Sequence, residues 1–153
     1  MDNNNIFRRL RYILGNNDLK MAEIFELAGH PIEQATVTTW LKQDDDRSFE
    51  PISDELLATF LNGLIIQKRG KKEGPLPVAE KEINNNLVFK KLRIAFDLQS
   101  DDILNMLKEV GTVLSPHELS AFFRKPTQSK YRECQDQYLR QFLSSLQLAE
   151  RGA

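Results

Sequence analysis

The chain repeats itself after a shift of 82 positions, and no other feature of the sequence limits the fold as strongly. The shift needs no gaps from the first copy to the last residues. The identical pairs include Asn3/Asn85, Asn4/Asn86, Phe7/Phe89, Leu10/Leu92, Arg11/Arg93, Asp54/Asp136, Phe60/Phe142 and Gly70/Gly152. Internal repeats of this kind indicate one structural unit used twice. Because units of this size are near the lower limit of independent stability, we expect the two copies to pack against each other.

Apolar residues recur at helical spacing in both copies. The first copy predicts helices over residues 4–14 and 18–28, a third helix that carries Val37, Trp40 and Leu41, and a long fourth helix that Gly70 ends. Asparagines before the first helix are candidate N-caps. Ser115 and Glu118 form a capping box before the third helix of the second copy, and Gly29 and Gly111 fit left-handed C′ positions. The fold class is therefore all-α: two tandem four-helix units, residues 1–70 and 83–153, joined by a linker over residues 71–82.

Several segments resemble those of the YehS family, a bacterial family of tandem domains. They are N-N-N-I-F-R-R-L-R-Y-I-L (3–14), F-L-N-G-L-I (60–65), I-N-N-N-L-V-F-K-K-L-R-I-A-F (83–96) and R-E-C-Q-D-Q-Y-L-R (132–140). The resemblance covers essentially the whole chain. It implies a small, duplicated, mostly helical protein, and it implies no activity, cofactor or catalytic residue.

Composition favours a cytoplasmic protein. The net charge is −1, so no global field attracts the chain to nucleic acid or membrane. No apolar run approaches the roughly 20 residues that span a bilayer, and the first residues lack a signal-peptide pattern. The one cysteine, Cys134, excludes an intrachain disulfide and fits a reducing compartment.

Two charged pairs are identical in both copies. Arg11 and Arg93 border the apolar stripe of the first helix, and Asp54 and Asp136 begin the fourth helix. We predict structural ion pairs, Arg11 with Asp54 and Arg93 with Asp136. An arginine left unpaired in a deep pocket would instead indicate a functional site.

A candidate basic binding surface lies in the second copy. Residues 83–153 hold ten Lys/Arg and eight Asp/Glu, whereas residues 1–82 hold eleven and fourteen. The candidate surface consists of Lys90, Lys91, Arg93, Arg124, Lys125, Lys130 and Arg132. Interleaved aromatic residues are typical of single-stranded RNA sites, but here they align with apolar positions of the first copy, which predicts core positions. The second and third helices of each copy also resemble a helix-turn-helix, although the third helix of the first copy has no basic outer face.

No grouping predicts catalysis, a metal site or a cofactor site. Asp44, Asp45 and Asp46 lack the alternating ligands of a calcium loop. His30 and His117 are not repeated, and Cys134 aligns with Ile52, which predicts a core position. Phosphate loops, dinucleotide fingerprints, zinc spacings and nucleophile elbows are absent from the sequence.

The sequence therefore favours a non-enzymatic cytoplasmic bacterial protein that acts as an interaction module, adaptor or regulator. The loops around residues 44–46 and 124–132 are equivalent in the repeat and opposite in charge. They suit a protein partner, or contact between two molecules of this chain in a homo-oligomer. The alternative is a nucleic-acid-binding regulator that uses the basic second copy. An enzyme is the third class.

Overall fold

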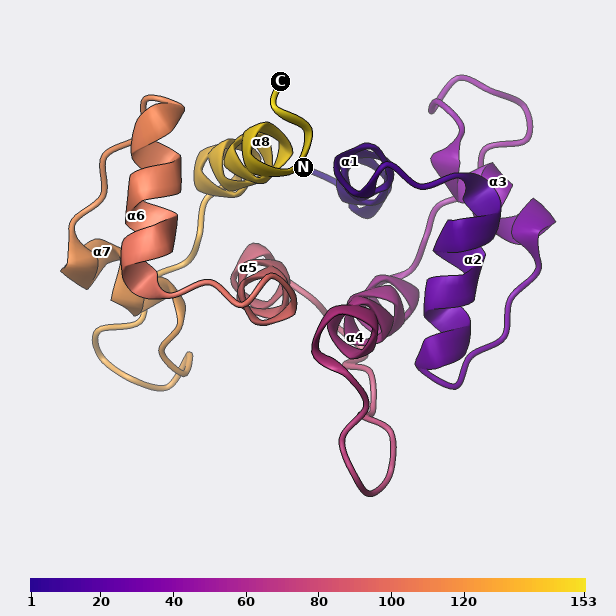
Figure 1. Ribbon diagram of the computed structural model, residues 1–153, viewed down its shortest axis with the longest axis horizontal. Helices are drawn as coiled ribbons and strands as arrows, with labels where there is room; N and C mark the ends of the chain where they lie inside the picture. The colour runs from indigo at the N-terminus through magenta and orange to yellow at the C-terminus, as the bar shows by residue number, and fades with distance from the viewer. The chain divides into compact units, whose positions relative to one another are not determined.

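The computed structural model describes residues 1–153 and consists of eight α-helices with no strand (Figure 1). It divides into two compact units, Met1–Ile83 and Asn84–Ala153. The first unit contains α1 (Asn3–Leu14), α2 (Asp18–Leu27), α3 (Gln34–Leu41) and α4 (Asp54–Arg69), and the second contains α5 (Asn85–Ala95), α6 (Ser100–Glu109), α7 (Pro116–Phe122) and α8 (Asp136–Arg151). The all-α class and the tandem duplication are thus confirmed.

Most helix ends follow the predicted chemistry. Ser53 caps α4 by accepting the N–H of Leu56 at 3.2 Å, and Ser115 and Glu118 form the predicted capping box of α7. Glu33, which precedes α3, makes no side-chain cap. Gly29 and Gly111 have φ values of +80° and +85°, which only glycine adopts cheaply. The N–H groups of Gly29 and of the next residue close the end of α2.

The prediction that asparagines cap α1 and α5 is correct only for Asn84 in α5. Asp2 caps α1 by accepting the N–H of Asn5 at 2.8 Å. At the equivalent position Asn84 caps α5 by accepting the N–H of Leu87 at 2.9 Å. The identical asparagines of the repeat lie one and two positions inside each helix. They have a different task, described below.

An aromatic cluster fills the core of the first unit. Phe7, Phe25 and Phe60 are fully buried, and Trp40 is almost so. Their ring centroids lie 5.0 to 6.1 Å apart, mostly tilted or edge to face. Such pairs add stability beyond the area they bury. One ring comes from each helix, so the cluster joins all four helices of the unit.

The second unit keeps the design with different rings. Phe89 and Phe142, which replace Phe7 and Phe60, are stacked with centroids 4.0 Å apart. Leu107 stands at the position of Phe25, and Phe123 now contacts Phe89 at 5.3 Å. One ring is lost at one position and another is gained elsewhere, so the core remains filled.

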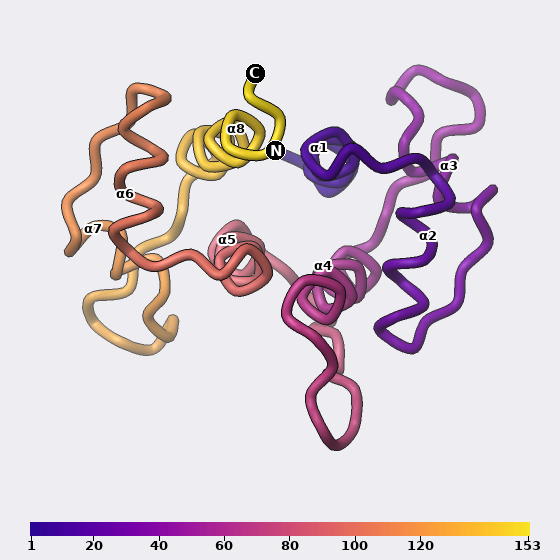
Figure 2. The backbone as a smooth tube through the Cα atoms, viewed as in Figure 1, coloured from indigo at the N-terminus to yellow at the C-terminus, as the bar shows by residue number.

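The segment after α4 packs with the first unit. It was predicted as a linker over residues 71–82, and it leaves α4 as an extended loop (Figure 2). A methyl group added to Gly29 would meet the side chain of Leu76 at 2.6 Å, so this loop returns to the end of α2. Ile83 then donates its N–H to the carboxylate of Asp54 at 3.1 Å. The boundary between the units therefore falls after residue 83.

The two units differ in how closely their second and fourth helices cross. At Gly63, α4 lies so near α2 that an added Cβ would lie 2.0 Å from the carbonyl oxygen of Ile24. The equivalent residue of α8 is Ser145, which is buried and donates to the carbonyl of Phe142 at 2.7 Å. The α6–α8 crossing thus accommodates a side chain that the α2–α4 crossing excludes.

We therefore expect Gly63→Ala to destabilise the first unit by about 3 kcal/mol, because the helices must separate. Trp40 is the only tryptophan and lies in that unit, so its fluorescence during urea unfolding gives the measurement. Ser145→Ala is the matched control and loses one hydrogen bond, worth about 1 kcal/mol. Because the second unit contains no tryptophan, circular dichroism measures the urea unfolding of this variant. An unchanged urea midpoint for Gly63→Ala would contradict the crossing geometry.

Candidate functional site

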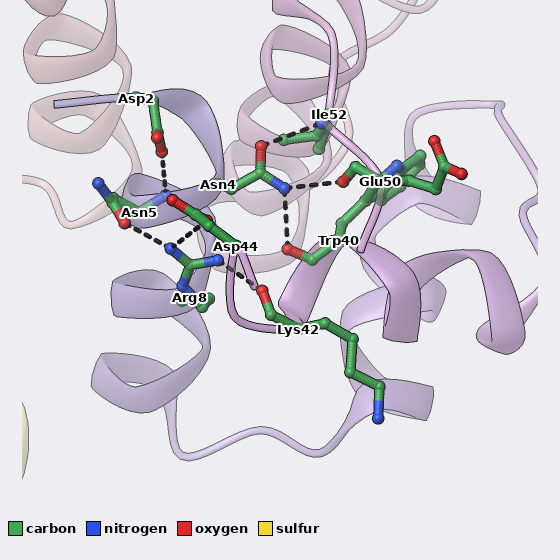
Figure 3. Close-up of polar contacts among 9 residues, drawn as sticks. All are labelled: Asp2, Asn4, Asn5, Arg8, Trp40, Lys42, Asp44, Glu50 and Ile52. Carbon is green, nitrogen blue, oxygen red and sulfur yellow. Dashed lines mark hydrogen bonds and ion pairs between the residues drawn. The ribbon is translucent and has the colours of Figure 1, made fainter. Parts of the chain in front are cut away.

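A buried asparagine ties the first helix of each unit to the loop between the third and fourth helices. Asn4 is only 3% exposed. Its Nδ2 donates to the carbonyls of Trp40 and Glu50, both at 3.0 Å, and its Oδ1 accepts the N–H of Ile52 at 3.2 Å (Figure 3). Three backbone groups from the two ends of the loop are thereby satisfied by one side chain. We call Asn4 and its equivalent the asparagine clamp.

The second unit repeats the clamp atom for atom. Asn86 donates to the carbonyls of Phe122 at 3.0 Å and Arg132 at 2.7 Å, and it accepts the N–H of Cys134 at 2.8 Å. Every partner lies 82 positions after its counterpart. Neither asparagine was predicted to have this role. The available signal was the exact register of Asn4 and Asn86, each two positions after the residue that caps its helix.

The neighbouring asparagine holds the start of the fourth helix. Asn3 donates to the carbonyl of Ile52 at 3.1 Å and to the carboxylate of Asp54 at 2.7 Å. Asn85 does the same to the carbonyl of Cys134 and the carboxylate of Asp136, at 2.9 and 2.7 Å. The two repeated aspartates are therefore held by asparagines.

The predicted ion pairs Arg11–Asp54 and Arg93–Asp136 are wrong. The aspartates contact the first residue of α1 or α5, whereas the arginines lie in the last turn. Eight residues of α-helix separate these positions by about 12 Å. The prediction placed both groups at the same border of a helix face and ignored their distance along its axis.

The repeated arginines lie where the first helix turns into the second. Arg93 donates through Nε to the carbonyl of Leu98 at 3.1 Å and through Nη2 to Ser100 at 3.4 Å. Its guanidinium carbon lies 4.7 Å from the ring centre of Phe123, a favourable cation–π contact. Arg11 occupies the same place in the first unit, where its Nε is buried. Arg93 is thus a structural residue of the turn.

The two clamped loops have the same backbone turns and opposite charge. We call residues 42–50 the acidic loop and residues 124–132 the basic loop. The backbone N–H of Phe49 donates to the carbonyl of Asp46, and that of Tyr131 donates to the carbonyl of Gln128, both at 3.1 Å. The acidic loop contains two cations and four acids; the basic loop contains four cations and no acid. Hydrogen bonds from the Ser48 hydroxyl and N–H lower the pKa of Asp46, so its charge persists to more acidic pH.

The candidate basic surface divides when its residues are placed in the fold. Lys91 is buried, and Arg93 is engaged with Phe123 and the turn. The remaining members are exposed: Lys90, Arg124, Lys125, Lys130 and Arg132. The pKa of Glu118, an acid that precedes the loop, is lowered by hydrogen bonds with Ser115 and then by the charge of Arg132. Five of the seven predicted residues are therefore available to a partner.

The remaining polar candidates have structural surroundings. Cys134 is buried beneath the clamp, and burial together with the charge of Asp136 raises its pKa to about 12. His30 and His117 are exposed on the surface. No group of three or more His, Cys, Asp or Glu side chains lies where it could hold a metal ion. Each unit also has a shallow surface recess at the start of its first helix, about 500 Å³ in the first unit and about 240 Å³ in the second, around the clamp residues.

The fold and the repeated clamp define a class: small helical proteins made of two tandem copies of one four-helix unit. The chain belongs to the family described as "Protein of unknown function (DUF1456)", which matches it twice, over residues 3–70 and 85–152. It is 44% identical over 147 residues to the "Uncharacterized protein YehS" of Escherichia coli (strain K12), covering 95% of this chain and 94% of that protein. No solved structure matches the chain. No helix is long and apolar enough to cross a bilayer.

We expect Asn86→Ala to destabilise the second unit by about 3 kcal/mol, because it leaves the buried carbonyl of Phe122, the part-buried carbonyl of Arg132 and the buried N–H of Cys134 without their partner. Asn84→Ala, two positions earlier, removes only an exposed helix cap and should cost about 1 kcal/mol. Urea unfolding followed by circular dichroism measures both. Equal losses would contradict the special role of the clamp.

The Cys134 thiol should resist alkylation in the folded protein at neutral pH. Its raised pKa leaves almost no thiolate, which is the nucleophilic form, and its side chain is buried. Iodoacetamide labelling measured by mass spectrometry should be complete in urea and minimal in buffer. Because the folded pKa lies above the unfolded one, this group's contribution to stability is present below about pH 9 and is lost as the pH rises toward about 12. Fast labelling of the native chain at pH 7 would contradict the buried placement.

Proposed function

We propose that this chain is a non-enzymatic cytoplasmic interaction protein, an adaptor or regulator, which presents the acidic and basic loops to partners. One observation carries the proposal. The same asparagine clamp holds both loops in the same turns, yet the loops carry opposite charge. The fold needs the asparagine and the backbone turns, and it does not need either set of charges. Charge that folding does not require is available for recognition.

The geometry of the loops supports this function. Each loop is anchored at both ends by hydrogen bonds to a buried side chain, so little conformational freedom is lost when a partner binds. Arg124, Lys125, Lys130 and Arg132 are exposed around the half-buried Tyr131. Arginine and tyrosine are enriched among residues that dominate binding energy. The basic loop therefore has the chemistry of an interaction surface.

The second candidate is a nucleic-acid-binding regulator, favoured by the exposed cations of the basic loop together with Lys90. The sequence predicts that this surface also includes Lys91 and Arg93, but Lys91 is buried and Arg93 is engaged in the turn. Single-stranded recognition further requires exposed aromatic faces. Phe122 is buried and Phe123 is covered by Arg93. These placements weaken this candidate relative to a protein partner.

The proposal is tested by site-specific photo-crosslinking in living bacteria that express the full chain. A photoreactive amino acid is placed in the basic loop at Lys130, in the acidic loop at Ser48, and on the exposed side of α6 at Lys108 as the control. We expect a discrete adduct from at least one loop and none from Lys108.

The nature of the adduct separates the candidates. An adduct removed by protease and resistant to nuclease supports a protein partner, and the reverse pattern overturns it in favour of nucleic acid. An adduct of twice the chain's own mass identifies a second copy as the partner, and light scattering at low and high salt then verifies the homo-oligomer. Absence of any adduct from either loop overturns the interaction function.

A further inference from the structure

In the first unit a carboxylate of the acidic loop, that of Asp44, forms an ion pair with Arg8 of α1. Arg8, whose side chain is 15% exposed, donates through Nη1 to the carbonyl of Lys42 at 2.7 Å. Its Nη2 contacts the carboxylate of Asp44 at 3.4 Å and the side chain of Asn5 (Figure 3). Arg8 thus joins α1 to the loop, and Asp44 supplies the anion.

The second unit keeps the cation and removes the anion. Lys90 stands at the position of Arg8, Pro126 at that of Asp44, and Leu87 at that of Asn5. The backbone turn is unchanged, because Gln128 donates to the carbonyl of Lys125 at 2.9 Å just as Asp46 donates to that of Gln43 at 3.0 Å. Lys90 is exposed, so a carboxylate can approach it from solvent.

Two further cations directly precede Pro126 in the chain. Arg124 and Lys125 occupy the positions of Lys42 and Gln43, so the loop gains one positive charge where it loses Asp44. Both are exposed. Like charges that are close together repel, and folding gains nothing from them. An anion bound among them relieves this repulsion and makes charge-assisted hydrogen bonds.

We propose that the second unit binds an acidic peptide segment of a partner protein, with one carboxylate held by Lys90 in the position that Asp44 occupies in the first unit, and with the exposed Arg124 and Lys125 adding to the positive charge of the loop. This inference rests on the proposed function and names the chemistry of its partner. The first unit supplies the template for the ligand: a carboxylate on a short side chain. Nucleic acid is the less favoured ligand, because Phe122 is buried and Phe123 is covered by Arg93, which leaves the half-buried Tyr131 as the one aromatic ring of the loop.

The decisive variant installs the internal carboxylate of the first unit in the second. Pro126→Asp should fill the site from within, and it should lower the affinity of the full-length chain for a fluorescent aspartate-rich peptide roughly tenfold. Ser129→Asp is the matched control: it adds the same charge to the same exposed loop, three positions after Pro126 and at the counterpart of Arg47 rather than of Asp44, and should lower the affinity only about twofold. Pro126→Asn separates loss of the proline from gain of the charge and should bind as the parent chain does. Fluorescence anisotropy at low salt and at about 0.15 M salt gives the affinities, and circular dichroism establishes that each variant is folded.

Each outcome decides the inference. A large loss for Pro126→Asp alone supports it. Equal losses for the two aspartate variants indicate diffuse attraction and overturn it, and so does failure of the parent chain to bind the peptide at low salt. A length-matched oligouridine that binds more tightly than the peptide, with the same sensitivity to Pro126→Asp, overturns it in favour of nucleic acid. If the peptide fails while crosslinking still yields a protein adduct, only this inference falls; if both fail, the proposed function falls as well.

Discussion

The structure of each unit depends on one buried asparagine. The loop between the third and fourth helices meets the start of the first helix and leaves three polar backbone groups buried or part-buried there. An unpaired buried group costs about 1–3 kcal/mol, so three such groups would exceed the stability that a unit of this size can spare. Asn4 and Asn86 satisfy all three with one amide. Asparagine suits this task, because its side chain donates two hydrogen bonds and accepts others on a short stem.

The two units also show which parts of the design tolerate change. Core residues were exchanged in a compensating way, with a ring lost at Leu107 and a ring gained at Phe123. The turn after the first helix is left-handed in both units, at Gly15 with φ of +64° and at Asp97 with φ of +54°. Aspartate is among the few other residues found there. Backbone geometry and the clamp are kept, whereas side chains that only fill space or face solvent vary.

The helical content and core of the protein followed from the sequence because each depends on local or periodic information. Apolar spacing placed Phe7, Leu10 and Ile13 in the core, and the Ser115–Glu118 pair fixed the start of α7. The polar contacts were less accessible, because a hydrogen bond across more than thirty residues leaves no local pattern. Thus Asp54 was matched with Arg11 by charge, although Asn3 is nearer along the helix. Repetition located the important positions without revealing their partners.

Repetition is informative in a second way, because an exposed position that differs between the units, where both adopt the same backbone turn, is one that the common fold leaves free. Arg8 and Asp44 form an ion pair in the first unit, but the second unit adopts the same loop with Lys90 and Pro126. The ion pair is therefore not required for the loop conformation. Exposed ion pairs contribute little to stability in any case, so losing one carries a small energetic penalty. A duplicated unit of this kind acquires a charged surface by removing the acids that would neutralise its cations. The four cations of the basic loop, unaccompanied by any acid within it, have this pattern.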